Sequence, residues 1–381
     1  MKYIKAKSIV LEDGIKDDVI LEIKDGKIHA ILDHLPKGVD FIDHSEHIVA
    51  PGFVDTHIHG MVGHDIMDAT KEGLLAISKA AARIGVTSFL PTTLTASVED
   101  TDQAIRNVAK NHQEVQGAKV RGIFLEGPFF AEKYKGAQNP LHFKNPRFDL
   151  LKHWVELADG LPIKIAVAPE LEGSTDFIRK AKEIGVTIAL GHTDATYDQA
   201  KEAVENGASI FVHMYNAMSP LHHRNPGMVG AGLTLKDVFA ELICDGHHVH
   251  PAAAQVVVGM RKPSSTALVT DCMSATCMPD GDYKLGDFDV KVAHGTAKME
   301  NGSLAGSILL LKDAVKNVVA WGIATPFEAI RMATLTPARS VGIDDVCGKI
   351  AIGYAADLAV LDEKLDLVAT YLNGEKFEPK L

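Results

Sequence analysis

The central part of the chain repeats one pattern, in which a short apolar run is followed by a longer stretch with helical periodicity. The eight apolar runs span residues 53–58, 86–90, 120–125, 163–167, 186–190, 209–212, 240–244 and 266–269. Helical periodicity appears between most of them, for example at 74–83, 98–108, 177–184 and 197–204. Alternating strands and helices build parallel sheets, and eight repeats favour closure into a (β/α)8 TIM-like barrel. An open doubly wound sheet is the alternative, but no G-x-G-x-x-G follows the first run to indicate a nucleotide site.

The two ends of the chain have a different pattern. Short β-branched segments lie at 3–9, 18–23 and 27–31, and again at 358–362 and 367–372. Turn sequences separate them, including Asn373-Gly374, which is typical of a tight hairpin. We therefore expect a small antiparallel sheet at each end, paired into one β-sandwich domain built from residues 1–50 plus 344–381. The barrel, residues 51–343, is then a closed unit inserted between the two ends.

Metal-binding side chains follow the predicted strands at the point where each strand ends. His57 and His59 lie on the same face of the first strand, because side chains alternate along an extended chain. Polar residues in comparable positions after later strands are Glu126, His192, His213 and Asp271. Active sites of barrels are built at the carboxyl ends of the strands, so all six side chains are expected at one mouth. Together they can bind one or two divalent metal ions and leave a carboxylate for proton transfer.

Each of these residues alone has an ordinary explanation. An H-x-H pair recurs by chance in a chain with 18 histidines. Single histidines at strand ends are often only hydrogen-bonded, and Glu126 or Asp271 could cap the segment that follows. It is the joint occurrence at strand ends that favours a metal site.

The charge and cysteine content narrow the classes of function. The formal net charge is −11, which argues against nucleic-acid binding and against binding to an anionic membrane. An anionic substrate would need local positive groups. The four cysteines lack C-x-x-C spacing, and there is neither a signal-peptide pattern nor an apolar run long enough for a transmembrane helix. We expect a cytoplasmic protein.

The motifs resemble those of the amidohydrolase superfamily and, within it, the N-acetylglucosamine-6-phosphate deacetylases. The superfamily resemblance comes from P-G-F-V-D-T-H-I-H-G at 51–60, the strand-end histidines and the late aspartate. The narrower resemblance comes from L-E-G-P-F at 125–129, K-G at 135–136, G-H-T at 191–193, H-M-Y-N-A-M at 213–218, D-G-H-H-V at 245–249 and L-A-G-S at 304–307. It extends through G-K-I-A-I-G-Y-A-A-D-L at 348–358, close to the end of the chain.

The resemblance implies a role for each residue of the metal cluster. Glu126, His192 and His213 would hold the metal ion that is always present in the family. His57 and His59 would complete a second site bridged by Glu126, giving two divalent ions per chain. Zinc, iron, manganese and cobalt all suit these ligands. Asp271 would be the general acid and base.

The resemblance also implies a substrate and a partner. The substrate would be N-acetylglucosamine 6-phosphate, hydrolysed at its acetamide, and the protein would be a homodimer whose partner reaches into the site. Phosphate contacts would come from Asn216, the backbone of Ala217, Arg224 and His248. Many relatives read K-G-x-H-N-P where this chain has Gln138, which can hydrogen-bond the substrate but cannot carry a charge.

Several alternatives remain open at the level of sequence. The epimeric substrate N-acetylgalactosamine 6-phosphate is one of them. A second is a cyclic-amide hydrolase or a deaminase, although these often use a carboxylated lysine where Glu126 stands here. A third is a binding protein that keeps an amidohydrolase-like fold without catalysis, although such proteins usually lose ligands that this chain retains.

Overall fold

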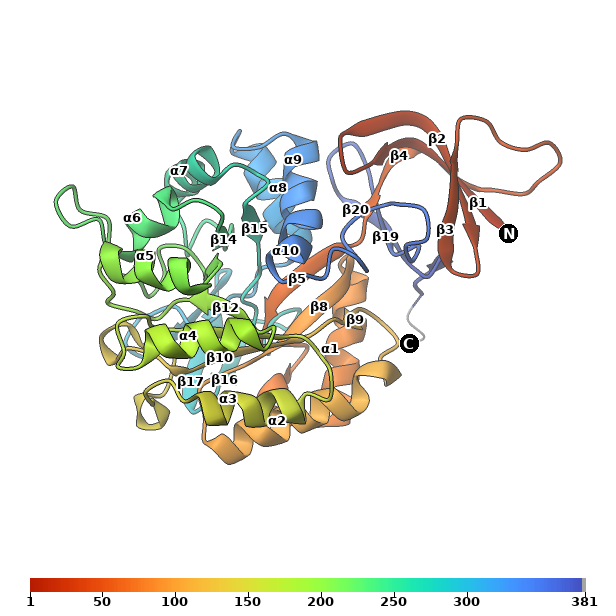
Figure 1. Cartoon of the computed structure of the whole chain (residues 1–381). Coiled ribbons are helices and arrows are strands. Elements are labelled where there is room, and N and C mark those ends of the chain that lie inside the picture. The colour runs from red at the N-terminus through yellow and green to blue at the C-terminus, as the bar shows by residue number, and fades with distance from the viewer. Residues whose placement is uncertain (379–381) are drawn as a thin grey trace.

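A nearly closed barrel of eight parallel strands forms the larger part of the molecule (Figure 1). The computed structural model describes residues 1–378. The barrel strands are, in order of pairing, β5 (Phe53–Ile58), β8 (Val86–Thr93), β10 (Ile123–Phe129), β11 (Ile163–Val167), β12 (Thr187–Leu190), β13 (Ile210–Phe211), β14 (Phe239–Leu242) and β15 (Thr266–Leu268). A parallel bridge between Ile58 and Cys272 connects the segment after β15 to β5. The predicted TIM-like barrel is confirmed.

The third predicted strand differs from the observed one. The apolar run at 120–125 is divided between β9 (Lys119–Val120) and β10. β9 pairs with β8, whereas the amide of Ile123 already donates to the carbonyl of Pro162, just before β11. The run is interrupted at Arg121-Gly122, and β10 then pairs with β8 on one side and with β11 on the other. A charged residue and a glycine inside the run were the available sequence signal for this break.

Helices cover the outside of the barrel (Figure 1). They are α1 (Lys71–Arg83), α2 (Val98–Asn111), α3 (Phe148–Leu157), α4 (Ser174–Glu183), α5 (Tyr197–Asn206), α6 (Gly227–Thr234), α7 (Pro251–Arg261), α8 (Leu311–Ala320), α9 (Pro326–Met332) and α10 (Leu335–Ser340). Each helix predicted from periodicity is present. In α1, for example, Thr70 caps the first turn, and Leu74 and Ile77 lie buried on the face toward the barrel. Among the described residues, no helix has both the length and the apolar character needed to cross a bilayer.

Strands from both ends of the chain form one seven-stranded sheet beside the barrel, seen in Figure 1 as red and blue segments lying together. Its order is β21 (Glu375–Lys376), β20 (Leu367–Leu372), β19 (Leu358–Leu361), β4 (Ile42–Pro51), β1 (Lys2–Val10), β2 (Ile15–Lys24) and β3 (Lys27–Leu32). The predicted joining of the termini is confirmed. The sheet is mixed rather than purely antiparallel, because β4 runs parallel to β1.

The terminal sheet curls around a core of its own. The amide of Ile28 on β3 donates to the carbonyl of Tyr354, in the segment that leads into β19. Apolar side chains from both ends of the chain, such as Leu21 and Tyr371, share this core. The hairpin at Asn373-Gly374 is present, with φ of 51° and 75°. β4 ends at Pro51 and β5 begins at Phe53, whereas the domain limits themselves stay a prediction.

Several small elements surround the mouth of the barrel. They are β6 (Gly60–Met61), β7 (His64–Asp65), the 3₁₀ helices η1 (Ile66–Asp68), η3 (Glu132–Tyr134) and η4 (Pro140–His142), and the antiparallel strands β16 (Gly281–Leu285), β17 (Phe288–Ala293) and β18 (Thr296–Met299). A further 3₁₀ helix, η2 (His112–Glu114), lies in the chain between α2 and β9. The sheet of β16 to β18 was not predicted. Its buried face packs on Leu94 and Met273, which brings Leu285 to the barrel mouth.

Candidate active site

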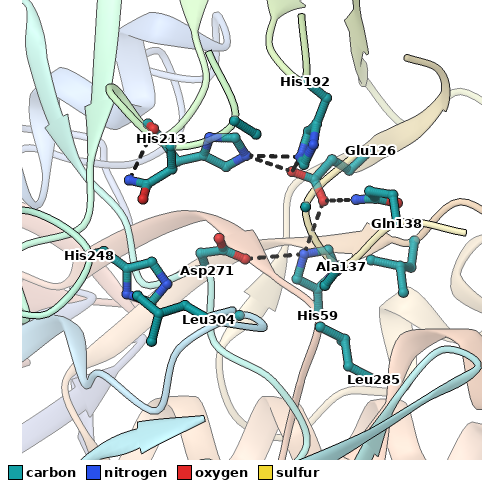
Figure 2. A pocket seen from close by; sticks show the side chains of 15 residues that line it. His59, Glu126, Ala137, Gln138, His192, His213, His248, Asp271, Leu285 and Leu304 are labelled. Atoms are coloured by element: carbon teal, nitrogen blue, oxygen red, sulfur yellow. Dashed lines mark hydrogen bonds and ion pairs between the residues drawn. The ribbon is translucent and has the colours of Figure 1, made fainter. Parts of the chain in front are cut away.

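The six strand-end residues meet at the carboxyl ends of the barrel strands. Two compact groups form there: His57, His59 and Asp271, and beside them Glu126, His192 and His213. Figure 2 shows His59, Glu126, His192, His213 and Asp271 directed toward one another. His57 lies deeper and is fully buried. The structure thus brings together all the metal-binding residues inferred from the sequence.

Glu126 lies between the two groups. Its Oε1 atom is 3.2 Å from Nε2 of His213 and 3.3 Å from Nε2 of His57. Its Oε2 atom is 3.3 Å from Nε2 of His59. One carboxylate therefore faces histidines of both groups, which is the arrangement required of a bridging ligand.

The spacing of the imidazoles fits a metal centre. Nε2 of His57 lies 3.3 Å from Nε2 of His59, and Nε2 of His192 lies 3.2 Å from Nε2 of His213. Two nitrogens bound at about 2.0–2.1 Å to a tetrahedral zinc ion are about 3.3 Å apart. The Nδ1 atom of His192 donates to the carbonyl of Tyr134, which leaves the lone pair of that ring on Nε2. The donor set and its geometry suit one or two divalent ions.

Unusual backbone conformations direct several of these side chains. His192, His213 and Asp271 have φ of 48°, 30° and 51°, in the left-handed region that non-glycine residues rarely occupy. Gly127, which follows Glu126, has φ of 111°, and a Cβ atom there would lie 2.0 Å from Oγ1 of Thr95. Strained backbone of this kind is concentrated at functional sites, where surrounding packing maintains it.

The electrostatics of the cluster depend on close carboxylate–imidazole contacts. Burial acts to lower the pKa of His57, but Asp271 and Glu126 outweigh it and raise the pKa to about 9. The same balance raises the pKa of His59 to about 10. Burial acts to raise the pKa of Asp271, but His57 and His59 hold it below its ordinary value. Without metal, the imidazoles of His57 and His59 are protonated at neutral pH, and Glu126 and Asp271 are ionised.

A cavity of about 260 Å³ opens above the cluster. Its lining combines polar groups of the cluster with apolar side chains, among them Leu285 and Leu304 (Figure 2) and also Leu94. Its volume is at the small end of the range for ligand sites, which favours a compact substrate. Asp271 lines the cavity with 13% of its side chain exposed, which makes this carboxylate accessible to a bound molecule.

Four of the five residues expected to contact the substrate line this cavity: Gln138, Asn216, Ala217 and His248. Arg224 is not among the described residues that line it. Arg224 lies exposed in a tight loop closed by a bridge between His222 and Asn225, and its guanidinium contacts His223. Within one chain, therefore, Arg224 is separate from the cavity.

Gln138 is fixed at both ends of its amide. Its Oε1 accepts from the amide of Thr95 at 2.9 Å, and its Nε2 donates to Oε2 of Glu126 at 2.7 Å. The Gln138 side chain thus contacts the carboxylate that faces both histidine groups.

His248 is held by a neighbouring carboxylate. Its Nδ1 lies 2.6 Å from Oδ2 of Asp245, which also accepts the backbone amides of His247 and His248 through Oδ1. This contact places the donated proton on Nδ1 and leaves Nε2 as the second polar atom of the ring.

Comparison with known proteins identifies the family. The model of the Amidohydrolase family matches residues 48–379. This chain belongs to the amidohydrolase family. The N-acetylglucosamine-6-phosphate deacetylase of Vibrio furnissii is 42% identical, over 93% of this chain and 86% of the relative. The N-acetylgalactosamine-6-phosphate deacetylase of Escherichia coli O157:H7 is 40% identical, over 98% of both chains.

Solved structures resemble this amidohydrolase over nearly its whole length. The N-acetylglucosamine-6-phosphate deacetylase of Pasteurella multocida has a TM-score of 0.94 and 27% identity, covering 99% of this chain and 100% of the other. A variant of the Mycobacterium smegmatis deacetylase, solved in complex with N-acetyl-D-glucosamine-6-phosphate, has a TM-score of 0.93 and 30% identity, covering 98% of both chains.

Sequence reasoning missed two charged residues beneath the metal cluster of this amidohydrolase. Glu241 on β14 and Lys164 on β11 are fully buried and form an ion pair inside the barrel. Glu241 also contacts Nδ1 of His57. The available signal was a charged residue inside each apolar run, since Lys and Glu are almost never fully buried unless paired.

Proposed function

We propose that this amidohydrolase hydrolyses the acetamide of N-acetyl-D-glucosamine 6-phosphate to D-glucosamine 6-phosphate and acetate, in amino-sugar catabolism and cell-wall sugar recycling. The observation that carries the proposal is the convergence of four imidazoles around Glu126, with Asp271 beside them, at the base of a small cavity. The similarity to deacetylases of phosphorylated amino sugars supports the choice of substrate.

The cluster would hold two divalent ions per chain. Glu126, His192 and His213 would bind one of them, and His57 and His59 would bind the second, with Glu126 shared. When bound, such ions supply Lewis-acid polarisation of the amide carbonyl and of water. Zinc, iron, manganese and cobalt all suit imidazole and carboxylate ligands.

Asp271 would move the proton during hydrolysis. Its ionised carboxylate is exposed to the cavity and can accept a proton from the attacking water. The water oxygen forms the new bond to the acetyl carbon, and the carbon–nitrogen bond of the amide breaks. Asp271 then delivers the proton to the departing nitrogen, so that acetate and a free amine result.

Polar groups at the rim would bind the rest of the substrate. Asn216, the backbone of Ala217 and His248 line the cavity and would bind the phosphate. The amide of Ala217 is a donor, and Nε2 of His248 donates when the ring carries a second proton. Gln138 contributes its second amide hydrogen to a sugar hydroxyl or the acetyl carbonyl, because its oxygen and its first amide hydrogen are already engaged.

Arg224 of the partner subunit would complete the phosphate site in a homodimer. Support comes from the exposed position of the loop that carries Arg224 and Leu221, and from two exposed apolar side chains one turn apart on α7, Val256 and Met260. Large exposed apolar side chains grouped in this way are typical of an interface. An arginine suits phosphate because its planar donors bind two oxygens at once.

We also propose a cytoplasmic location. All four cysteines are free, which fits a reducing compartment, and the net charge of −11 gives no basis for contact with nucleic acid or an anionic membrane.

The epimer N-acetylgalactosamine 6-phosphate is the second candidate substrate. A relative named for this activity is 40% identical over 98% of both chains. A cyclic-amide hydrolase has less support, because Glu126 occupies the bridging position and Lys164, on the fourth barrel strand, is engaged by Glu241.

The decisive experiment is an acetate-release assay on protein of known metal content. We expect efficient turnover of N-acetylglucosamine 6-phosphate, weaker turnover of the galacto epimer and poor turnover of unphosphorylated N-acetylglucosamine. Faster turnover of the galacto epimer would move the assignment to the second candidate. Absence of acetate release from all three sugars with metal bound would reject the deacetylase proposal.

A further inference from the structure

A buried ion pair crosses the interior of the barrel beneath the metal cluster. Lys164 comes from β11 and Glu241 from β14, and Nζ of Lys164 contacts Oε1 of Glu241. The ammonium also lies 3.4 Å from the carbonyl of Thr56 and 3.6 Å from the centre of the Phe124 ring. Neither charged residue lines the cavity, so neither can touch the substrate.

Glu241 connects this ion pair to one of the metal ligands. Its Oε2 atom is 3.3 Å from Nδ1 of His57, and its Oε1 atom accepts from the hydroxyl of Thr56 at 3.4 Å. An ionised carboxylate only accepts, so His57 must donate from Nδ1. In the neutral ring that a metal ion requires, the lone pair of His57 is then on Nε2, the atom that faces His59 and Glu126.

The other imidazole of the proposed second metal position has no such support. Nδ1 of His59 is buried without a hydrogen-bond partner among residues 1–378. On the opposite side of the cluster, His192 relies on the neutral carbonyl of Tyr134. Within the described cluster, His57 is therefore the imidazole whose Nδ1 is oriented by a buried carboxylate, that of Glu241. This contact affects the His57 and His59 group and not the His192 and His213 group.

The positive charge of Lys164 lowers the free-energy cost of burying the Glu241 carboxylate. An isolated carboxylate inside the barrel would be costly, and it would take up a proton or draw one from His57. The Lys164 ammonium compensates the charge, so that Glu241 can remain an acceptor for His57. The two residues work as one unit behind the cluster.

We propose that Glu241, held in place by Lys164, is a positioning residue that orients His57 and thereby sets the occupancy of the second metal position. The inference rests on the proposed two-metal site. It assigns to the barrel interior a role in metal loading that is separate from substrate contact. Partners that orient metal ligands from behind typically change metal affinity about 10- to 100-fold when they are removed.

The test is metal binding by a Glu241→Gln variant, measured as ions per chain while free metal is varied. We expect the first ion to bind as in the wild type and the second to bind about 10- to 100-fold more weakly. Asp102→Asn serves as the matched control, because Asp102 is a partly buried carboxylate on α2, outside the barrel, where it contacts His153 and Trp154. The control should retain both ions.

A second variant separates the loss of His57 orientation from a general loss of fold stability. Glu241→Gln leaves Lys164 unpaired and can destabilise the fold, whereas Lys164→Met combined with Glu241→Gln removes both charges at similar volume. We expect this double variant to regain thermal stability and still to bind the second ion weakly. Recovery of normal second-ion affinity in the double variant would overturn the proposal, as would normal affinity in a folded single variant.

The wild-type titration distinguishes this inference from the proposed function. A single ion per wild-type chain at saturating metal would reject the two-metal site, and the role of Glu241 would be rejected with it. Two ions in the wild type, a weakened second ion in the variants and no acetate release from any sugar would uphold the role of Glu241 while rejecting the deacetylase activity.

Discussion

At the scale of single residues, Asp271 depends on a backbone conformation that few aspartates adopt. Its φ of 51° is maintained by hydrogen bonds on both sides, from its own amide to the carbonyl of His57 and from the amide of Ser307 to its carbonyl. These bonds set the carboxylate between Nε2 of His59 and the cavity. Proton transfer requires a carboxylate that is held in a fixed position, and these bonds provide it for Asp271.

Replacing Asp271 by asparagine tests its proposed role. The amide has nearly the same shape but cannot accept and deliver the proton, so kcat should fall about 100-fold or more. Metal analysis should find at least the ion at Glu126, His192 and His213 in place. Wild-type turnover in the Asp271→Asn protein would show that another group moves the proton.

Replacing Arg224 by alanine tests phosphate recognition. A hydrogen bond to a charged group contributes about 1.5–3 kcal/mol, so kcat/KM for N-acetylglucosamine 6-phosphate should fall about 10- to 100-fold. The low activity on unphosphorylated N-acetylglucosamine should hardly change, because that sugar lacks the group that Arg224 would bind. Arg147→Ala, at another exposed arginine, is the control. A parallel loss on both substrates with metal intact would make Arg224 structural.

At the scale of elements, the end of β5 and the residue that follows it supply both imidazoles of the proposed second metal position. The strand alternates Ile58 toward one side, with His57 and His59 toward the other, so a single strand end delivers two ligands. β10 supplies the shared carboxylate, and its pairing with β11 shifts register between Leu125 and Phe129, the stretch that contains Glu126. The two strands are separated by β8 in the sheet, yet their ends meet because the barrel is closed.

Changing both His57 and His59 to glutamine tests this division of the cluster. We expect bound metal to fall from near two ions per chain toward one, because Glu126, His192 and His213 remain. Glu126→Gln should weaken both positions, since that carboxylate contacts histidines of both groups. Metal content after gel filtration, measured by atomic emission, gives the ratio. Two ions retained in the His57 and His59 variant would contradict the assignment.

At the scale of the whole molecule, metal loading should be linked to pH. In the metal-free protein the pKa values of His57 and His59 are raised to about 9 and about 10, above their ordinary value near 6.5. Their contribution to stability is therefore complete below about pH 6.5 and is lost as pH rises through 9 to 10. A bound metal replaces those protons, so the loaded protein avoids this loss.

The predicted result is a gap in Tm between the loaded and metal-free protein that widens from pH 6.5 to pH 10. Adding metal to the metal-free protein at pH 7.5 should also release protons, which calorimetry in buffers of different ionisation enthalpy detects. A gap that narrows with rising pH would contradict the assigned protonation states.

The proposed homodimer can be tested by mixing subunits. Asp271→Asn and Arg224→Ala chains each have a defective site alone. In a mixed dimer, the site with an intact Asp271 receives Arg224 from the Asp271→Asn partner. Random reassembly should restore about a quarter of wild-type activity, since half the dimers are mixed and each has one complete site of two. No recovery in verified mixed dimers would place Arg224 outside the partner's site.

The sequence by itself determined the barrel and the ligands. Apolar runs and helical stretches recur because each strand–helix unit must bury one face. That periodicity can be recognised within each short segment of the sequence. The metal-binding residues could be found for the same reason, since His57, Glu126, His192 and Asp271 each stand at or just after the end of an apolar run, and strand ends of a barrel share one mouth.

Only the tertiary structure decided which residues support those ligands. Lys164 and Glu241 are 77 positions apart, and although a charge inside an apolar run signals a buried pair, nothing local to either one identifies its partner beneath His57. Likewise, local pattern does not reveal that Gln138 spans Thr95 and Glu126 or that Arg224 lies outside the cavity of its own chain. Ligand identity follows from residue type and strand position, whereas orientation follows from contacts between distant strands, and these exist only after the barrel has closed.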